Sequence, residues 1–224
     1  MVKAVFLDFY GTIVHEDNEI VKEITQRIYI TGYAEKQSDI SSYWWHCFQS
    51  VFNESKGETF KTQRELELIS LYNTIRHFNS NEDALKLSKL MFDFWIKPKI
   101  FEESKLFFEL CPVPIIIVSN IDIDDITKAL SYHNLKPYGV VTSEEARAYK
   151  PQPAIFEYAL TKYDLKTGEV IHIGDSITSD VLGAQAAGIS AIWVNRFGKP
   201  APDVADSVAA NLPDVLKLNY FQSK

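Results

Sequence analysis

The sequence contains few cysteines and no long apolar segment. Cys47 and Cys111 are the only cysteines among 224 residues, and they lie far apart in the chain. This spacing predicts neither a disulfide framework nor a zinc site, and we expect both residues to be buried thiols. No apolar run is long enough to span a membrane, and no basic and apolar leader precedes the first predicted strand. We therefore expect a cytoplasmic protein that has no membrane partner.

Positive charge is also scarce. The chain has 23 Lys and Arg against 30 Asp and Glu, which gives a net charge of −7. This excess of acidic residues argues against a nucleic-acid partner, although a local site can still bind a small anionic substrate. The five histidines show no spacing typical of metal ligands. Nothing in the sequence indicates the oligomeric state, so a monomer and a homodimer both stay open.

Apolar residues make up 46% of the chain, enough for a substantial core in one domain with an insertion or in two small domains. Short apolar runs predict buried strands at residues 4–7, 115–118, 138–141, 170–173 and 191–194. From about residue 100 onward these strands alternate with predicted helices, a pattern typical of a parallel sheet. We therefore predict a Rossmann-like α/β core, residues 1–14 and 96–224, with an all-helical domain, residues 15–95, inserted after the first strand.

The predicted helical domain is rich in aromatic residues, most of which we assign to its own core. Trp44, Trp45 and His46 are adjacent in one predicted helix. A helix cannot bury three adjacent bulky side chains on one side, because successive residues point in different directions. If any aromatic residues of this domain face a substrate, we expect them to be these three.

Three predicted strands end in residues that can carry chemistry. Asp8 closes the first strand, Ser119 and Asn120 close the second, and Asp175 closes the fourth. Parallel strands place their carboxyl ends along one edge of a sheet, so these residues can converge with Lys150, which precedes a predicted helix. Carboxylates are the ligands that Mg²⁺ prefers, and the lysine, hydroxyl and amide groups suit phosphate oxygens. The set therefore favours a divalent cation together with a phosphoryl group.

These segments resemble the four motifs of the haloacid dehalogenase-like (HAD) superfamily, in the same order. The first motif is Asp8-Phe9-Tyr10-Gly11-Thr12, the second contains Ser119, the third contains Lys150, and the fourth begins with residues 174–180. The resemblance covers nearly the whole predicted core. It implies that residues 15–95 form a helical cap in the C1 position of that family.

The resemblance also implies a hydrolase in which Asp8 attacks phosphorus and forms an aspartyl-phosphate. Lys150 would keep Asp8 ionised and offset charge on the transferred group. Mg²⁺ would be held by Asp8, the backbone carbonyl of Tyr10, and Asp175, while Asp180 would orient metal-bound water or Lys150. The implied catalytic residues are Asp8, Tyr10, Lys150 and Asp180. The implied binding residues for a small phosphorylated substrate are Gly11, Thr12, Ser119, Asn120 and Lys150.

Tyr10 departs from the phosphatase pattern, which usually has a second Asp here to protonate the leaving alcohol. A tyrosine, with an ordinary pKa near ~10, is a poor base at neutral pH. Tyrosine at this position is the pattern of the 2-haloacid dehalogenases, in which the aspartate attacks carbon without a metal. Asp175, Phe156 and the lack of arginine around residues 37–40 depart from the dehalogenase pattern. We therefore favour phosphatase activity and keep 2-haloacid dehalogenase activity as the alternative.

Two other readings also stay open. Phosphonatase-like chemistry uses a cap lysine that forms a Schiff base, but we assign Lys56 and Lys61 to the solvated surface. A chain with Tyr10 could instead keep the scaffold and the metal site as a binding or regulatory protein. We expect His172, in a buried strand, to be a core histidine. The sequence does not identify the substrate.

Overall fold

The computed structural model describes residues 2–200 and 204–221. The chain divides into two compact units. The first unit contains residues 1–16, 99–120 and 133–224, and the second contains residues 17–98 and 121–132. The helical insertion that follows the first strand therefore belongs to the second unit.

A six-stranded parallel sheet forms the centre of the first unit, which confirms the predicted α/β fold. The strands are β1 (Ala4–Leu7), β2 (Ile115–Ser119), β3 (Gly139–Thr142), β4 (Val170–Gly174), β5 (Ser190–Val194) and β6 (Ser207–Ala209). Every residue of β1, β2 and β4 is buried, which explains why these strands are continuous apolar runs in the sequence.

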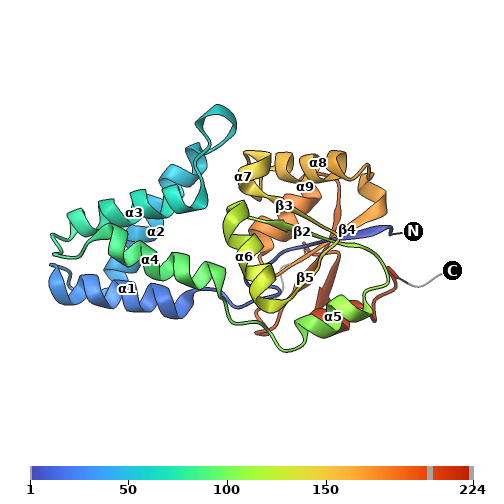
Figure 1. Ribbon diagram of the computed structural model, residues 1–224, viewed down its shortest axis with the longest axis horizontal. Coiled ribbons are helices and arrows are strands. Elements are labelled where there is room, and N and C mark those ends of the chain that lie inside the picture. Colours follow the sequence, from blue (N-terminus) through green and yellow to red (C-terminus); the bar gives the residue numbers. More distant parts are fainter. Residues whose placement is uncertain (1, 201–203, 222–224) are drawn as a thin grey trace. The chain divides into compact units, whose positions relative to one another are not determined.

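Helices cover both faces of this sheet, as Figure 1 shows. One face carries α7 (Ser143–Ala146), α8 (Pro153–Lys162), the π-helical segment η3 (Ile177–Leu182) and α9 (Gly183–Ala186); α5 (Ser104–Leu110) and α10 (Leu212–Val215) lie on the other. A short 3₁₀ turn, η2 (Thr167–Glu169), leads into β4. Phe6, Val118 and Phe156 are fully buried or nearly so and belong to the apolar core under α8 and η3.

The strand order is β3-β2-β1-β4-β5-β6. The chain moves outward from β1 through β2 to β3 and then returns to pair β4 on the other side of β1. Sheets of this order bind ligands at the carboxyl ends of the strands where the direction reverses. Asp8 follows β1 and Asp175 follows β4, so the two carboxylates flank this reversal.

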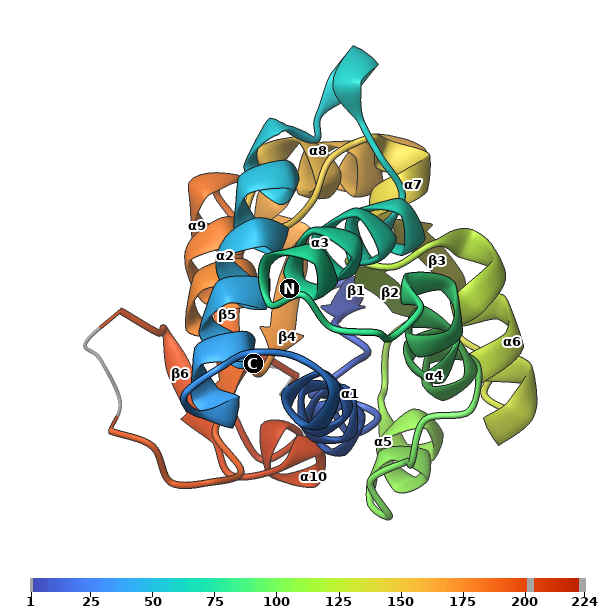
Figure 2. The same ribbon diagram turned by 90° about the vertical axis from the view of Figure 1, so that its left-hand side faces the viewer.

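The second unit is helical. It contains α1 (Asn18–Thr31), α2 (Gln37–Glu54), the short 3₁₀ turn η1 (Gly57–Thr59), α3 (Gln63–His77), α4 (Ala84–Ile96) and most of α6 (Ile123–His133). Figure 2 shows α1 to α4 gathered into a bundle, in which α2 packs on α1 and α3, and α4 packs on α1 and α3. The predicted helical insertion after β1 is therefore present.

Side chains fix where these helices begin. Thr62 and Glu65 form a capping box at the start of α3, and the Asp83 carboxylate accepts a hydrogen bond from the Lys86 amide at the start of α4. Asp122 accepts from the first backbone amide of α3, that of Gln63, at 2.7 Å. Within the described residues, no helix combines the length and the apolar character that crossing a membrane requires.

Candidate active site

Lys150 lies between two buried carboxylates at the carboxyl edge of the sheet. Its Nζ atom is 2.6 Å from Asp8 Oδ1 and 2.6 Å from Asp180 Oδ1. All three side chains are more than nine-tenths buried, so both ion pairs are charge-assisted hydrogen bonds shielded from water. The structure thus brings together an aspartate that follows β1, a lysine that precedes α8 and an aspartate of η3.

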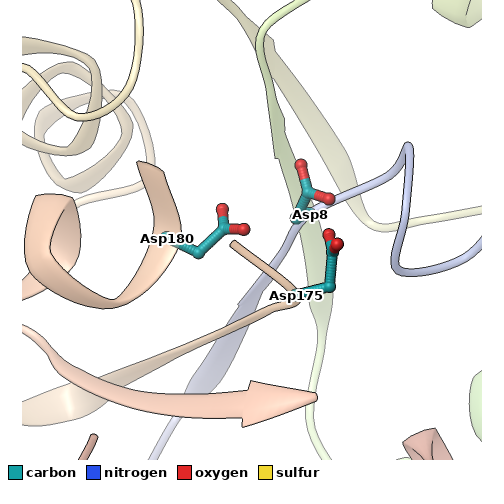
Figure 3. A group of neighbouring side chains, drawn as sticks. All are labelled: Asp8, Asp175 and Asp180. Atoms are coloured by element: carbon teal, nitrogen blue, oxygen red, sulfur yellow. The ribbon is translucent and has the colours of Figure 1, made fainter. Parts of the chain in front are cut away.

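Asp175 completes a cluster of three carboxylates. One oxygen from each of Asp8, Asp175 and Asp180 lies within 4.8 Å of the other two. Figure 3 shows the three side chains approaching one another. Thr12 Oγ1 donates to Asp175 Oδ1 at 3.2 Å, so the Thr12 side chain, which the resemblance implied in substrate binding, supports this carboxylate.

Burial and mutual repulsion alter the protonation of the cluster. Burial raises the pKa of Asp8 to about 6, although the charge of Lys150 opposes the shift. Burial, together with the charge of Asp8, raises the pKa of Asp175 to about 8. Burial alone would raise the pKa of Asp180, but Lys150 and His172 hold it well below its usual range. A cation beside Asp8 and Asp175 would relieve the repulsion between them.

Both oxygens of Asp180 are occupied by protein partners. Oδ1 accepts from Lys150 and lies 2.9 Å from His172 Nε2, while Oδ2 accepts from the Ser176 amide at 2.9 Å. His172 is fully buried, as expected for a core histidine, and burial lowers its pKa, so its imidazole is neutral at pH 7. Asp180 is therefore suited to holding Lys150 in place.

Asp8 and Asp175 fit a divalent cation better than Asp180 does. Asp8 Oδ2 is buried and has no hydrogen-bond partner within the part of the chain that the structure describes. A buried carboxylate oxygen without a donor is costly unless a cation or another group satisfies it. Hard oxygen donors on neighbouring strands are what Mg²⁺ requires from a protein. The cluster could therefore hold a metal ion, with Asp180 in a supporting position.

Gly11 shapes the turn that follows Asp8. Its φ of +91° is strained for residues with a side chain, and a Cβ atom there would collide with the Asp175 carboxylate. Its backbone amide donates to the Val14 carbonyl at 2.7 Å. The resemblance implied that Gly11 binds the substrate, whereas in the structure its amide hydrogen bond lies within the turn. Gly11 therefore contributes its conformation and its lack of a side chain.

Ser119 and Asn120 end β2 beside β1. Ser119 is buried and stands two residues beyond Ile117, which pairs with Leu7 in register, so its hydroxyl belongs to the same edge as Asp8. The Asn120 side chain accepts from the Lys150 amide at 2.7 Å and donates to the Lys150 carbonyl at 2.9 Å. Asn120 thereby fixes the backbone that carries the lysine.

Two residues near the carboxyl end of β5 also contact the site, and the sequence analysis did not identify them as site residues. Trp193, near the end of β5, donates from Nε1 to the Asp175 carbonyl at 2.7 Å. Arg196, in the loop after β5, donates to the carbonyls of Gly11 and Thr12 at 3.2 and 2.7 Å. Ligands of parallel sheets bind at the carboxyl ends of the strands, and β5 is one of these strands. The position of Trp193 and Arg196 at or just after the end of β5 was therefore the sequence signal that could have identified them.

Comparison with known proteins supports this architecture. A family model described as haloacid dehalogenase-like hydrolase matches residues 2–188. The chain belongs to the haloacid dehalogenase-like hydrolases. Two curated relatives of this HAD chain are the glyceraldehyde 3-phosphate phosphatase of Pyrococcus furiosus, 34% identical over 85 residues, and the human N-acylneuraminate-9-phosphatase, 32% identical over 85 residues. These alignments cover 35% of this chain and 35% and 34% of the relatives, about a third of their length.

Solved structures match nearly the whole chain at low identity. The L-2-haloacid dehalogenase of Xanthobacter autotrophicus superposes with a TM-score of 0.78, 19% identity and full coverage of both chains. The HAD hydrolase YfnB of Bacillus subtilis, solved with magnesium bound, gives a TM-score of 0.73 and 18% identity, covering 96% of this chain and 97% of its own. At these identities the likeness establishes the fold. Phosphatases and dehalogenases are thus both represented among the relatives of this HAD hydrolase.

Proposed function

We propose that this HAD hydrolase is a magnesium-dependent phosphatase that acts on a small phosphorylated metabolite through an aspartyl-phosphate on Asp8. The observation that carries the proposal is the pair of neighbouring carboxyl groups, of buried Asp8 and partly buried Asp175, at the point where the strand order reverses. Without a cation, burial and the charge of Asp8 keep the pKa of Asp175 at about 8, whereas a bound cation would let both carboxyl groups ionise at neutral pH. The names of both curated relatives, which are phosphatases of small phosphorylated compounds, support the same conclusion.

In this proposal each buried side chain has a defined part in the reaction. Asp8 attacks phosphorus, the alcohol leaves, and water then hydrolyses the aspartyl-phosphate to release phosphate. Lys150, fixed by Asp180 and Asn120, keeps Asp8 ionised and offsets charge on the transferred group. When bound, Mg²⁺ would neutralise charge on the carboxylates and the phosphate, held by Asp8, Asp175 and the backbone carbonyl of Tyr10.

The phosphate-binding groups in the proposal are the Ser119 hydroxyl, the Asn120 backbone amide and the Lys150 ammonium group. Their support is positional, since all three residues stand at the carboxyl edge beside Asp8. Gly11 allows the turn to pass close to Asp175, and the Thr12 hydroxyl donates a hydrogen bond to the Asp175 carboxylate. How efficient the proposed phosphatase is depends mainly on Tyr10, which stands where phosphatases of this family usually have a second Asp.

Tyr10 favours a second candidate, a metal-independent 2-haloacid dehalogenase. Its side chain is partly buried and its ring packs edge-on against Phe9, with the ring centroids 5.0 Å apart. A tyrosine there lacks the carboxylic acid that would protonate an alcohol leaving group, whereas a departing halide needs no proton. Asp175 weighs against this candidate, because a second acid beside the nucleophile has no part in a reaction that proceeds without a metal.

Product release by the purified chain separates the two candidates. Phosphate release is measured from p-nitrophenyl phosphate and a panel of phosphorylated metabolites, with Mg²⁺ or with EDTA. Halide release is measured from 2-chloropropionate under both conditions. We expect phosphate release that requires Mg²⁺ and is abolished in Asp8→Asn and Asp175→Asn. Asp164→Asn, which removes an exposed acid of the same unit, is the matched control and should keep full activity.

Halide release that persists in EDTA, without phosphate release, would overturn the proposal in favour of the dehalogenase. Binding of Mg²⁺ or phosphate without release of either product would indicate a binding or regulatory protein. Full phosphatase activity in Asp8→Asn would show that the nucleophile lies elsewhere.

A further inference from the structure

The helical unit contains a cavity of its own, of about 270 Å³. Four aromatic side chains line it, those of Trp44, Trp45, Phe48 and Trp95. Its two acidic lining residues are Asp17 and Glu67. The volume lies just below the usual range for sites that bind drug-sized ligands, so it suits a smaller organic group.

The aromatic walls present mainly apolar and π surface. The indole N–H of Trp44 already donates to Ser70 Oγ at 3.1 Å, and that of Trp95 donates to Asp17 Oδ2 at 3.2 Å. These donors are therefore not available to a ligand. The Trp45 ring stacks on Phe48, with centroids 5.9 Å apart and an interplanar angle of 9°. The faces of such rings attract cations.

Glu67 is the unusual member of the lining. It lies in the second turn of α3, is only 4% exposed, and its Oε1 atom has no hydrogen-bond partner within the described residues. A buried carboxyl group with an unsatisfied oxygen is destabilising unless a ligand provides what the protein does not. The described lining contains no lysine, arginine or histidine that could neutralise Glu67.

We infer that this cavity binds a small organic cation, an alkylated ammonium group, through its aromatic walls and the carboxylate of Glu67. Aromatic side chains arranged around an acidic group are a common way for proteins to recognise quaternary ammonium ligands. Asp17 adds a second negative charge on the same cavity, which favours a cation over a neutral or anionic ligand. The inference concerns the helical unit alone and does not depend on the phosphatase reaction.

The protonation of Glu67 gives binding a characteristic pH dependence. Burial, and secondly the charge of Asp17, raises the pKa of Glu67 to about 8 in the empty cavity. The cavity-lining residues of α2 and α4, Ser41, Trp44, Trp45, Phe48, Met91 and Trp95, carry no charge. A cation prefers the ionised carboxylate, so its affinity should rise about fifty-fold between pH 6 and pH 8. A neutral ligand that accepts a hydrogen bond from the protonated acid should bind more weakly as the pH rises.

Choline and its neutral isostere 3,3-dimethylbutan-1-ol test the inference on the intact chain. Binding of each is followed by tryptophan fluorescence and by calorimetry at pH 6, 7 and 8. We expect choline to bind with an affinity that rises with pH, and the alcohol to bind at least tenfold more weakly than choline at pH 8. Glu67→Gln should weaken choline binding at least tenfold and leave the alcohol unchanged. The exposed charge control Asp93→Asn, on α4, should bind choline like the natural chain.

Equal affinity for choline and the alcohol in the natural chain would overturn the inference, and this comparison does not depend on any variant folding. Absence of choline binding at millimolar concentration would also overturn it. Asp8→Asn should keep choline binding even though it lacks the proposed nucleophile. A failure of the phosphatase proposal is therefore distinguishable from a failure of the cavity proposal.

Discussion

Arg196 Nη2 donates a 2.7 Å hydrogen bond to the backbone carbonyl of Thr12, which joins the loop after β5 to the turn after β1. The guanidinium group also lies 3.9 Å from the centre of the Phe101 ring and pairs with Glu103 at 3.0 Å. Arg196 thus fixes the turn that carries Gly11 and Thr12 without belonging to any of the four family motifs.

Arg196→Met should destabilise the first unit and lower activity. The change leaves the Gly11 and Thr12 carbonyls without their donors, which costs about 1–3 kcal/mol in the free energy of unfolding. Urea unfolding and the rate of phosphate release measure the two effects. Lys136→Met, which removes an exposed charge in the same unit, is the control and should change neither. Unchanged stability in Arg196→Met would show that the turn is held by its own hydrogen bonds.

Tyr10→Asp should raise the rate of phosphomonoester hydrolysis. A carboxylic acid at this position can protonate the leaving alcohol, a contribution on the order of 10²-fold or more. Steady-state rates on p-nitrophenyl phosphate and on an alkyl phosphate measure the gain, which should be larger for the alkyl phosphate because its leaving group is more basic. Tyr10→Asn has the same size without the acid and should show no gain. Equal rates in the two variants would mean that another group supplies the proton.

Lys150→Met should abolish activity and destabilise the fold. Two carboxylates, Asp8 and Asp180, would then be buried without their counterion, which costs about 3–5 kcal/mol in the free energy of unfolding. Adding Asp180→Asn to this variant should restore part of the stability and none of the activity. Urea unfolding and phosphate release test both effects. Stability that falls further in the double variant would show that Asp180 is stabilised mainly by His172 and Ser176.

Stability should fall as the pH rises through the range set by Glu67. Its pKa is raised from 4.5 to about 8 in the folded chain, so the folded state holds a proton that the unfolded chain releases in this interval. The free energy of unfolding should therefore decrease between pH 4.5 and pH 8, by about 4 kcal/mol at the upper end. Urea unfolding at pH 5 and pH 8 measures this change.

Comparing variants isolates the effect of Glu67, because Asp8 and Asp175 contribute changes of the same sign. Glu67→Gln stays neutral at every pH and should lose most of the difference between pH 5 and pH 8. Asp93→Asn, with an exposed acid removed, should keep the full difference. Identical pH dependence in the natural chain and in Glu67→Gln would contradict the burial of an uncompensated acid at this position.

Much of the sheet could be predicted because strands buried on both faces appear as apolar runs. The same pattern located Asp8 and Asp175, since a polar residue directly after such a run marks the edge where parallel strands end. The rule did not find Arg196, because its contacts are to backbone carbonyls and depend on the path of a loop. The short helix α7 was also missed, since one turn gives no periodicity.

In the helical unit, the sequence predicted the helices but only some of the residues that line the cavity. Trp44, Trp45 and His46 were the aromatic residues predicted to face a substrate, and the structure places Trp44 and Trp45 in the lining of the cavity. His46 is exposed and is absent from the described lining. Glu67 gave no signal, because an acidic residue in a helix is ordinarily solvated, and its burial results from how α3 packs against α2 and α4.

The central position of β1 determines the order in which the molecule can be completed during synthesis. β1 precedes the helical insertion in the chain, whereas both of its neighbours, β2 and β4, are translated only after that insertion. The α1–α4 bundle makes contacts that are more local in sequence, so it can form before β2 and β4 are available to pair with β1. Asp8 is therefore the first residue of the site to leave the ribosome, and its partners Lys150 and Asp175 reach it only after most of the chain has emerged.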